Sequence, residues 1–468
     1  MRYYLAVDMG ASSGRHILAH VESGKIILEE VYRFENSTEY RNGHLCWNTQ
    51  EQMGHILAGM KECKRLGKIP YSMGIDTWGV DFALLDEADQ PVGDTVAYRD
   101  ARTEGMDVLL SSFLTEDEHY QITGIQKQPF NTIYQLLALR EQEPEQLDRA
   151  ATILFLPEYF NFLLTGVKMT EYSIASTSAM LDAQAKTWSA ELLRRVGLPE
   201  RIFSREVCPP GTTVGRLTPA MQAEVGYDTT VILPPCHDTG SAFLAVPARD
   251  DNAVYISSGT WSLLGIESPT PIICHDGARA NFTNEGGYQY RYRFLKNIMG
   301  LWMIQSIRRN LNKAYSFAQL EAMAKEAGSF SSIVDVNDLC FFAPESMIDA
   351  VKQYCEGTGQ PVPATIGEVM QCVYRSLARC YADAIKGLSA ITGRTFSSIN
   401  IVGGGTKDVY LNALTADATG LPVYAGPTEG TALGNIMAQA LADGTFADIA
   451  SARAAIGNSF EILYYEPR

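Results

Sequence analysis

Positive charge is scarce in this sequence. The 468 residues include 38 lysines and arginines against 54 aspartates and glutamates, which gives a net charge of −16 at pH 7. A broad basic face is what proteins use to hold a nucleic-acid backbone, so nucleic-acid binding is not expected. An acidic chain can still bind a phosphorylated small molecule where backbone amides and a metal ion supply a local positive field.

Long apolar runs and paired cysteine motifs are also missing. No stretch approaches the roughly 20 apolar residues that cross a bilayer, and the first residues contain no long apolar segment of the secretory kind. The nine cysteines show neither a CxxC pair nor zinc-finger spacing. We therefore expect a cytoplasmic protein with reduced thiols and no membrane association, and no obligate protein partner is evident.

The P-loop is absent, but a different phosphate-binding turn is present. Residues 8–15 read Asp-Met-Gly-Ala-Ser-Ser-Gly-Arg, between an apolar, β-prone run at 3–7 and strand-like runs at 16–21 and 25–34. Such a hairpin can direct backbone N–H groups into a concavity that holds an anion, and Asp8 at the strand end could hold a metal. The alternative interpretation is a Gly-Ser hairpin without a ligand.

A polar motif interrupts the middle of the chain at residues 233–242. The strand-like run 230–233 stops at two prolines, which cannot donate to a sheet, and His237, Asp238 and Thr239 follow. A carboxylate on a turn between strand and helix is well placed to act as a general base. The alternatives are that Asp238 only caps a helix and that His237 only orients its neighbour.

Residues 71–82 predict two strands around a polar and aromatic centre. Trp78 could form an apolar wall for a small ligand, and Asp81 could accept hydrogen bonds from its hydroxyls. The alternative is a hairpin whose tryptophan belongs to the core.

The second half of the chain repeats the plan of the N-terminus. A strand at 252–257 enters the Gly/Ser turn 257–262, and a second strand follows at 263–267. Later, a strand at 399–402 enters the triplet Gly403-Gly404-Gly405 before a helix. Glycines there let a flat ring or a phosphate approach the bare backbone. The residues themselves do not repeat, so the duplication is one of architecture.

Helical patterns fill much of the remainder. Residues 49–66 predict an amphipathic helix, and 365–391 predict the longest one, capped by Thr365 and ended by Gly393. A helix is also predicted over 296–310, with Asn297, Leu301 and Gln305 on one face that either borders a site or faces water. Residues 314–360 are predicted to be rich in loops.

These parts together are the parts that phosphoryl transfer requires. Two Gly/Ser turns, a carboxylate after the first strand, a carboxylate on the central turn and a late glycine triplet could position a nucleotide and orient a hydroxyl nucleophile. The pattern predicts a duplicated α/β fold whose phosphate turns face each other across a cleft.

The chain resembles the FGGY family of carbohydrate kinases, within the actin-like ATPase superfamily. The literal tetrapeptide Phe-Gly-Gly-Tyr does not occur, and Cys236 stands where small polar residues are common. The resemblance covers almost the whole chain in order. It is carried by residues 8–15, 74–82, 97–100, 129–132, 237–239, 257–262, 283–287, 295–302 and 402–405.

The resemblance implies an α/β fold of two actin-like, ribonuclease H-like domains with a catalytic cleft between them. Residues 1–244 would form the sugar and phosphate side, and residues 245–468 the nucleotide side. The implied reaction is the ATP- and Mg²⁺-dependent phosphorylation of L-rhamnulose at its 1-hydroxyl, in L-rhamnose catabolism. The alternatives are a sibling kinase acting on L-fuculose or a pentulose, and a sugar sensor without catalysis.

The resemblance also implies roles for individual residues. Asp238 would be the general base, and Asp8 would help to position Mg²⁺. The substrate side would comprise Gly79, His237, Asp238 and Thr239, together with Trp78 and Asp81. The ATP side would comprise Ala11, Ser12, Ser13, Gly14, Arg15, Thr260, Asn297, Gln305 and Gly404.

Overall fold

The computed structural model describes residues 1–468 as two compact units, each assembled from three segments of the chain. The first unit contains Met1–Ala245, Glu267–Phe294 and Thr431–Ser459. The second contains Val246–Ile266, Leu295–Gly430 and Phe460–Arg468. Each unit is therefore discontinuous in sequence. The predicted halves, residues 1–244 for the sugar and phosphates and residues 245–468 for the nucleotide, are divided by function, and this division stays a prediction.

The first unit is built from both strands and helices. Its strands are β1 (Tyr3–Met9), β2 (Ser13–Glu22), β3 (Lys25–Glu35), β4 (Thr38–Arg41), β5 (His44–Trp47), β6 (Pro70–Thr77), β7 (Phe82–Leu85), β8 (Thr152–Phe155), β9 (Thr170–Glu171), β10 (Leu181–Asp182), β11 (Thr187–Trp188), β12 (Val207–Cys208), β13 (Thr213–Arg216), β14 (Thr230–Ile232) and β17 (Thr283–Gly286). Its helices are α1 (Thr49–Arg65), α2 (Met106–Ser111), α3 (Glu116–Thr123), α4 (Thr132–Gln142), α5 (Pro144–Arg149), α6 (Leu156–Thr165), α7 (Tyr172–Ser176), α8 (Ala190–Arg195), α9 (Pro219–Val225), α10 (Asp238–Leu244), α11 (His275–Arg279), α17 (Gly430–Ala442) and α18 (Ile449–Ser459).

The second unit is smaller and has longer helices. Elements that cross a border between the units are grouped with the unit that holds most of their residues. Its strands are β15 (Ala253–Ser258), β16 (Ser262–Ser268), β18 (Tyr292–Ile298), β19 (Ser398–Val402), β20 (Val423–Ala425) and β21 (Leu463–Tyr465). Its helices are α12 (Trp302–Asn310), α13 (Phe317–Glu326), α14 (Met347–Gly357), α15 (Ile366–Thr392) and α16 (Val409–Thr419).

A six-stranded sheet in the order β13-β14-β6-β1-β2-β3 organises the first unit. Strand β1 is antiparallel to β2 and parallel to β6, and β6 is parallel to β14. Parallel strands end at the same edge of a sheet, so whatever follows β1, β6 and β14 is brought together. The register places Asp8 opposite Asp76, and Thr77 bridges to His237.

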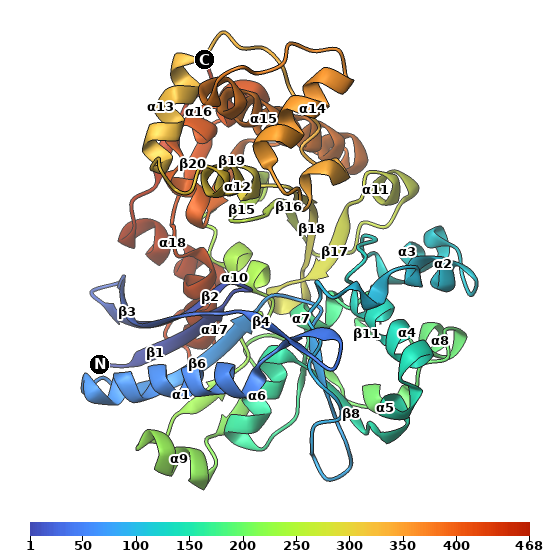
Figure 1. The fold of residues 1–468 in the computed structure, drawn as a ribbon. Helices are drawn as coiled ribbons and strands as arrows, with labels where there is room; N and C mark the ends of the chain where they lie inside the picture. The colour runs from blue at the N-terminus through green and yellow to red at the C-terminus, as the bar shows by residue number, and fades with distance from the viewer. The chain divides into compact units, whose positions relative to one another are not determined.

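Helices cover both faces of this sheet, as Figure 1 shows for α1, α6 and α17. Side chains alternate between the faces of a strand. On β6, Ser72 donates to Gln439 of α17 (2.7 Å), and a Cβ on Gly74 would lie 2.5 Å from Asn435 of the same helix. On the opposite side of the sheet, α1 packs so closely against His16 of β2 that only a glycine fits at Gly59. The predicted helix at 49–66 is confirmed as α1.

The sheet of the second unit repeats this plan strand for strand. Six of its strands follow the order β21-β20-β19-β15-β16-β18. Strand β15 is antiparallel to β16 and parallel to β19, β19 is parallel to β20, and β20 is antiparallel to β21. The pairs β1/β2 and β15/β16 are therefore equivalent hairpins, which confirms the duplicated architecture. Helix α15 begins after the Thr365 cap and ends at Gly393, as predicted.

Two predictions of secondary structure are wrong. The helix expected over 296–310 begins only at Trp302, because β18 continues to Ile298 and the chain then turns at Gly300. A Cβ on Gly300 would lie 2.5 Å from the Ser262 hydroxyl, so close packing fixes that turn. Asn297 and Gln305 therefore share no helix face. The region 314–360 contains α13 and α14, and the capping box Ser316–Gln319 was the available signal for α13.

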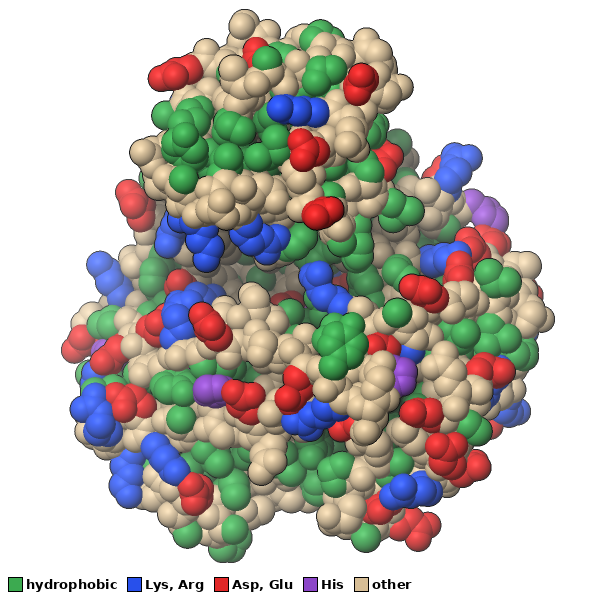
Figure 2. Space-filling view, in the orientation of Figure 1, with side chains coloured by type: hydrophobic (Ala, Val, Ile, Leu, Met, Phe, Trp, Pro, Cys, Tyr) green, Lys and Arg blue, Asp and Glu red, His purple; other side chains and the backbone are tan.

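Three further features concern the charge of the surface, the character of the helices and the state of the thiols. Figure 2 shows acidic and basic side chains interspersed on the visible face of the first unit. None of the helices combines the length and the apolar character needed to cross a membrane. All nine cysteines are free thiols.

Two helical glycines give a matched test of the packing between α10 and α17. A Cβ on Gly434 of α17 would lie 1.8 Å from the Ser241 carbonyl oxygen, whereas a Cβ on the exposed Gly54 of α1 would meet no atom within 4 Å. We expect Gly434→Ala to lower the free energy of unfolding by about 1–3 kcal/mol or more, because backbone must move. Gly54→Ala should raise it by about 0.5–1 kcal/mol. Urea unfolding followed by circular dichroism measures both, and equal stability of the two variants would contradict this packing.

Candidate active site

Three carboxylates meet at the edge where β1, β6 and β14 end. Asp8 and Asp76 lie opposite each other in the parallel register and are 8% and 0% exposed. His237 bridges to Thr77, and Asp238 follows it as the first residue of α10. Burial, the negative charge of Asp8 and, more weakly, that of Asp238 raise the pKa of Asp76 well above its usual value. The three groups are therefore within electrostatic reach of one another.

An amide pair on α17 holds the buried carboxylate of Asp76. Asn435 donates to Asp76 Oδ2 at 2.6 Å, and Gln439 donates to Asn435 Oδ1 at 2.8 Å and to the Leu5 carbonyl at 3.0 Å. The other oxygen, Asp76 Oδ1, is buried with no hydrogen-bond partner. A buried carboxylate oxygen without a donor is a candidate ligand for a cation. Asp76 falls within the motif predicted at residues 71–82 but was given no role there, although it stands one residue before the end of β6, just as Asp8 does in β1.

The turn after β1 presents its serines to solvent. Gly10 closes the turn by donating its N–H to the Ser13 carbonyl (2.9 Å), and Ser12 and Ser13 are exposed. Arg15 lies opposite Asp8 in the β1–β2 register and donates twice to Asp8 Oδ2, at 2.9 and 3.1 Å. The predicted Gly/Ser hairpin is thus present, with a guanidinium beside the carboxylate.

Asp238 presents one carboxylate oxygen that has no donor in the structure. Its side chain is 32% exposed, and its Oδ1 accepts from the Thr239 N–H (2.6 Å) and hydroxyl (3.0 Å), while Oδ2 receives no hydrogen bond. The N-cap position of α10 belongs to His237, whose side chain makes no capping bond. Asp238 is therefore not the cap of this helix, and its Oδ2 is available to accept a proton.

A buried network fixes the imidazole of His237. Arg293 NH2 lies 3.1 Å from His237 Nδ1 and 3.1 Å from Glu285 Oε2, and its Nε donates to the Gly286 carbonyl at 2.8 Å. His237 Nδ1 also lies 3.2 Å from Glu285 Oε2, so it faces both a guanidinium and a carboxylate. The other ring nitrogen, Nε2, lies 3.4 Å from Asp238 Oδ1. Burial alone would raise the pKa of Glu285, but Arg293 and His237 bring it below the usual value.

Glu171 ties the central turn to α7. Its Oε2 accepts from the Cys236 N–H (3.1 Å) and from the Ser173 hydroxyl (2.6 Å), and that hydroxyl accepts from the His237 N–H (3.1 Å). Burial raises the pKa of Glu171. Sequence reasoning missed Glu171, Glu285 and Arg293, because their positions follow from long-range folding and not from local spacing.

Two tryptophans share the carboxylate of Asp81. Trp47 and Trp78 donate their indole N–H groups to Asp81 Oδ2 at 2.7 and 2.8 Å, and their rings lie 4.3 Å apart. Gln135 donates to Oδ1 at 3.2 Å. Asp81 thus positions the aromatic pair, and its Oδ1, which accepts from Gln135 alone, keeps acceptor capacity for the predicted bond to a substrate hydroxyl. Trp47, from β5, could not have been found by spacing.

The turn between Trp78 and Asp81 is strained and tightly held. Val80 has φ of 69°, a left-handed conformation that β-branched residues rarely adopt. Its N–H donates to the Thr177 hydroxyl (3.0 Å), and its carbonyl accepts from Thr132 (2.8 Å). A Cβ on Gly79 would lie 2.9 Å from Thr177. Strain that the surroundings enforce is frequent at ligand sites. The strands flanking the turn, β6 and β7, belong to different sheets, so the alternative of a simple hairpin is wrong.

Four of the residues predicted to bind ATP lie in the second unit, around the β15–β16 turn. Thr260 is exposed in that turn, and its carbonyl accepts from the Trp302 N–H (3.0 Å) at the start of α12. Asn297 Oδ1 on β18 is buried without a partner, and Gln305 is half-buried on α12.

The glycine triplet lies beside the same turn. A Cβ on Gly403 would lie 2.8 Å from the Ser258 carbonyl, and one on Gly405 would lie 2.0 Å from the Ser258 hydroxyl. Gly404, in contrast, is exposed, and its nearest neighbour would be 4.0 Å away. The outer two glycines serve internal packing, while Gly404 leaves backbone open to solvent.

Comparison with known proteins agrees with this geometry. The model of the FGGY family of carbohydrate kinases, N-terminal domain, matches residues 3–245, and the model of the C-terminal domain matches residues 254–442. The chain therefore belongs to the FGGY family of carbohydrate kinases, and it is an enzyme of the sugar kinase class.

Similar proteins cover nearly the full chain. A rhamnulokinase from Halalkalibacterium halodurans is 48% identical over 466 residues, covering 99% of this chain and 99% of its own. A rhamnulokinase from Oceanobacillus iheyensis is 47% identical over 461 residues, covering 98% and 97%. The crystal structure of gluconate kinase from Lactobacillus acidophilus superposes with a TM-score of 0.83 at 18% identity, covering 100% of this chain and 94% of that one. The predicted fold class of two actin-like α/β domains is confirmed.

Asp81 predicts a pH response of the aromatic pair. Burial raises the pKa of Asp81 to about 6, although four donors oppose the shift. A raised pKa means that folding favours the protonated form, so the contribution of this group to stability falls as the pH rises from about 4 through about 6. Below pH 6 the neutral carboxyl binds the two indoles less strongly. We expect tryptophan fluorescence to titrate with a midpoint near pH 6 and Asp81→Asn to abolish that step; a titration that persists in this variant would contradict the assignment.

Proposed function

We propose that this enzyme transfers the γ-phosphoryl group of ATP to the 1-hydroxyl of L-rhamnulose, giving L-rhamnulose 1-phosphate and ADP, as part of L-rhamnose catabolism. Relatives named rhamnulokinase, at 40–48% identity over almost the whole chain, support this substrate. The observation that carries the chemistry is the carboxylate of Asp238. One of its oxygens has no donor, and it lies at the strand edge shared with Asp8 and Asp76.

Asp238 acts as the general base in this proposal. The ketose hydroxyl donates to Asp238 Oδ2, the proton passes to that oxygen, and the freed alkoxide oxygen forms a bond to the γ-phosphorus while the bond to ADP breaks. His237, which Arg293 and Glu285 contact, lies with its Nε2 3.4 Å from Asp238 Oδ1 and so limits the movement of the carboxylate. Gly79 and Thr239 contact the sugar, Trp78 forms an apolar wall beside it, and Asp81 accepts from its hydroxyls.

The chain's residues also fit a Mg²⁺ ion with ATP. No group of three potential ligands is present, which suits Mg²⁺ because it uses one or two carboxylates together with phosphates and waters. Asp8 and Asp76, with the unpartnered Oδ1 of Asp76, would hold it. When bound, Mg²⁺ would neutralise charge on the transferring phosphates.

The ATP side is proposed from both units. The first turn, residues 11–15, receives the phosphates, and Thr260 contacts them from the second unit. Asn297 and Gln305 line the nucleotide, and the open backbone of Gly404 lies against the adenosine. Residues 1–244 serve the sugar and phosphates and residues 245–468 the nucleotide. We further propose a cytoplasmic location, which suits nine free thiols.

A substrate panel tests the proposed reaction. Magnesium-dependent ADP release is measured with L-rhamnulose, L-fuculose, L-ribulose and D-xylulose at equal concentration. We expect the highest kcat/KM with L-rhamnulose, because a few contacts worth about 1–3 kcal/mol each separate related sugars by 10-fold or more. Omitting the sugar is the control for background hydrolysis.

Each other outcome has a definite meaning. Preference for L-fuculose or a pentulose would refute the proposed substrate and favour the sibling kinase. Sugar binding without ADP release in any mixture would refute catalysis and favour the sensor.

A further inference from the structure

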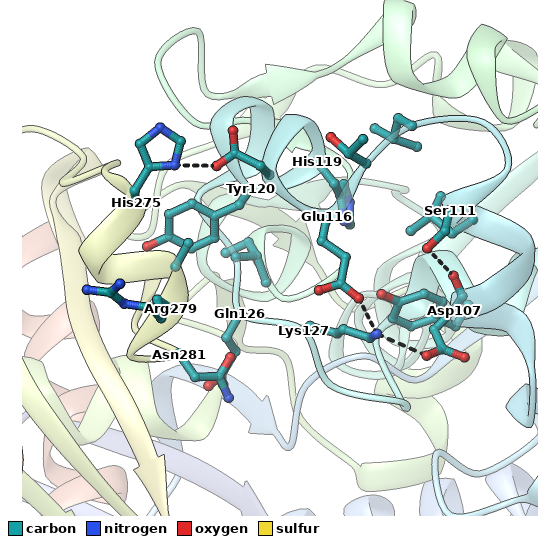
Figure 3. A pocket seen from close by; sticks show the side chains of 17 residues that line it. Asp107, Ser111, Glu116, His119, Tyr120, Gln126, Lys127, His275, Arg279 and Asn281 are labelled. Carbon is teal, nitrogen blue, oxygen red and sulfur yellow. Dashed lines mark hydrogen bonds and ion pairs between the residues drawn. The ribbon is translucent and has the colours of Figure 1, made fainter.

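A cavity lies in the first unit, between α2, α3 and α11. Its volume is about 650 Å³, and Figure 3 shows the side chains that line it. This volume is in the range of small-molecule sites. Its lining shares no residue with the carboxylate site or with the tryptophan pair. We call it the α3–α11 cavity.

The cations on the wall of this cavity are already paired. Lys127 forms ion pairs with Asp107 (2.9 Å) and with Glu116, which Figure 3 draws as dashed lines. His275 pairs with Asp117 at 2.9 Å, and Arg279 pairs with its helix neighbour Asp276 at 2.8 Å. The charged groups of the wall thus pair with one another, so the cavity favours a neutral ligand.

One buried polar group in the wall lacks a partner. Gln126 is 4% exposed, and its Oε1 is buried with no hydrogen-bond partner. Figure 3 places Gln126 between Arg279 and Asn281 on one side and Lys127 on the other. A buried acceptor without a donor costs about 1–3 kcal/mol, which a donating ligand removes.

The wall also supplies a donor and an apolar surface. The Tyr134 hydroxyl makes no hydrogen bond within the protein, and burial raises the pKa of Tyr134 to about 12, so the hydroxyl stays protonated. Leu110, Leu114 and Ile125 also line the cavity as buried apolar side chains. The wall therefore combines an acceptor, a donor and aliphatic contacts within one cavity.

We propose that the α3–α11 cavity binds a neutral polyhydroxylated molecule of monosaccharide size. A sugar hydroxyl donates to Gln126 Oε1, another accepts from Tyr134, and the C–H face of the ring packs on the aliphatic side chains. An aromatic ligand such as a nucleoside fits less well, because the wall presents no stacked pair of rings. The binding itself does not depend on which ketose the enzyme phosphorylates.

The cavity is connected to the catalytic carboxylate through β17. Tyr120 donates to the Phe282 carbonyl (2.9 Å), and Asn284 donates to the Gly124 carbonyl through its N–H (2.8 Å) and its side chain (3.1 Å). The next residue, Glu285, contacts His237 at 3.2 Å. A ligand that orders α3 and residues 124–126 therefore acts on the network that positions Asp238.

The test compares two glutamines that lie two residues apart. The full chain is titrated with L-rhamnose, D-mannose and D-glucitol, and with adenosine as the comparison, by calorimetry and saturation-transfer NMR. Gln126→Met removes the buried acceptor, whereas Gln128→Met changes a glutamine that does not line the cavity. Tyr134→Phe is the second cavity variant. ADP release is recorded in the same samples, and thermal unfolding verifies that each variant is folded.

We expect at least one polyol to bind with a Kd below about 1 mM. Its Kd should rise about 10-fold in Gln126→Met and in Tyr134→Phe, the usual effect of one buried hydrogen bond, and stay unchanged in Gln128→Met. The bound polyol should shift the KM for the ketose, and Gln126→Met should abolish the shift.

Absence of polyol binding, binding that is insensitive to Gln126→Met, or binding of adenosine alone would overturn the site. Binding with unchanged kinetics would overturn its connection to Asp238. Failure of L-rhamnulose in the substrate panel would leave these results intact.

Discussion

The constraint on which the site depends is that three carboxylates lie at one edge of one sheet. The parallel register of β1, β6 and β14 makes this unavoidable, because it brings the residues after each strand together. Like charges so close, in a partly buried place, repel by several kcal/mol unless other groups offset them. Arg15 offsets Asp8, Asn435 donates to Asp76, and Thr239 donates to Asp238. A cation bound together with ATP would neutralise the negative charge that remains.

The surroundings of Asp238 restrict its freedom without using up its basic oxygen. The N–H and hydroxyl of Thr239 donate to Oδ1, and His237, which Arg293 contacts, places its Nε2 3.4 Å from the same oxygen. Glu171 accepts a hydrogen bond from the backbone N–H of Cys236 in the same turn. All of these partners are buried, so the side chain is oriented by groups that cannot move easily. Such preorganisation lets a carboxylate that keeps one oxygen without a donor act as an efficient base.

Much of the fold could be predicted because local signals agreed with the tertiary structure. Strands β1 and β15 each lead into a Gly/Ser turn, and α15 carries a Thr365 cap and a Gly393 stop. The helix predicted from residue 296 was wrong because the tight contact of Gly300 with Ser262 cannot be read from periodicity.

The site could be predicted in part for the same reason. The sequence shows Asp8 near the end of a strand-like run and Asp238 shortly after the two prolines that stop another. Asp76 lies near the end of β6, but only the parallel register makes it a partner of Asp8. Glu285 and Arg293 reach His237 from strands far along the chain, and Trp47 reaches Asp81 in the same way. No spacing rule in one sequence encodes those contacts.

The most direct test of the account is a single-turnover measurement of phosphoryl transfer with Asp238→Asn. The exposed Asp383, which pairs with Arg379 on α15, provides the control Asp383→Asn. The account predicts that Asp238→Asn lowers the rate constant of transfer by about 10²–10⁴-fold, the usual contribution of a general base. The Kd values for ATP and sugar should remain close to those of the unmodified enzyme, and Asp383→Asn should behave like it. A well-folded Asp238→Asn enzyme that transfers phosphate at a near-normal rate would contradict the account.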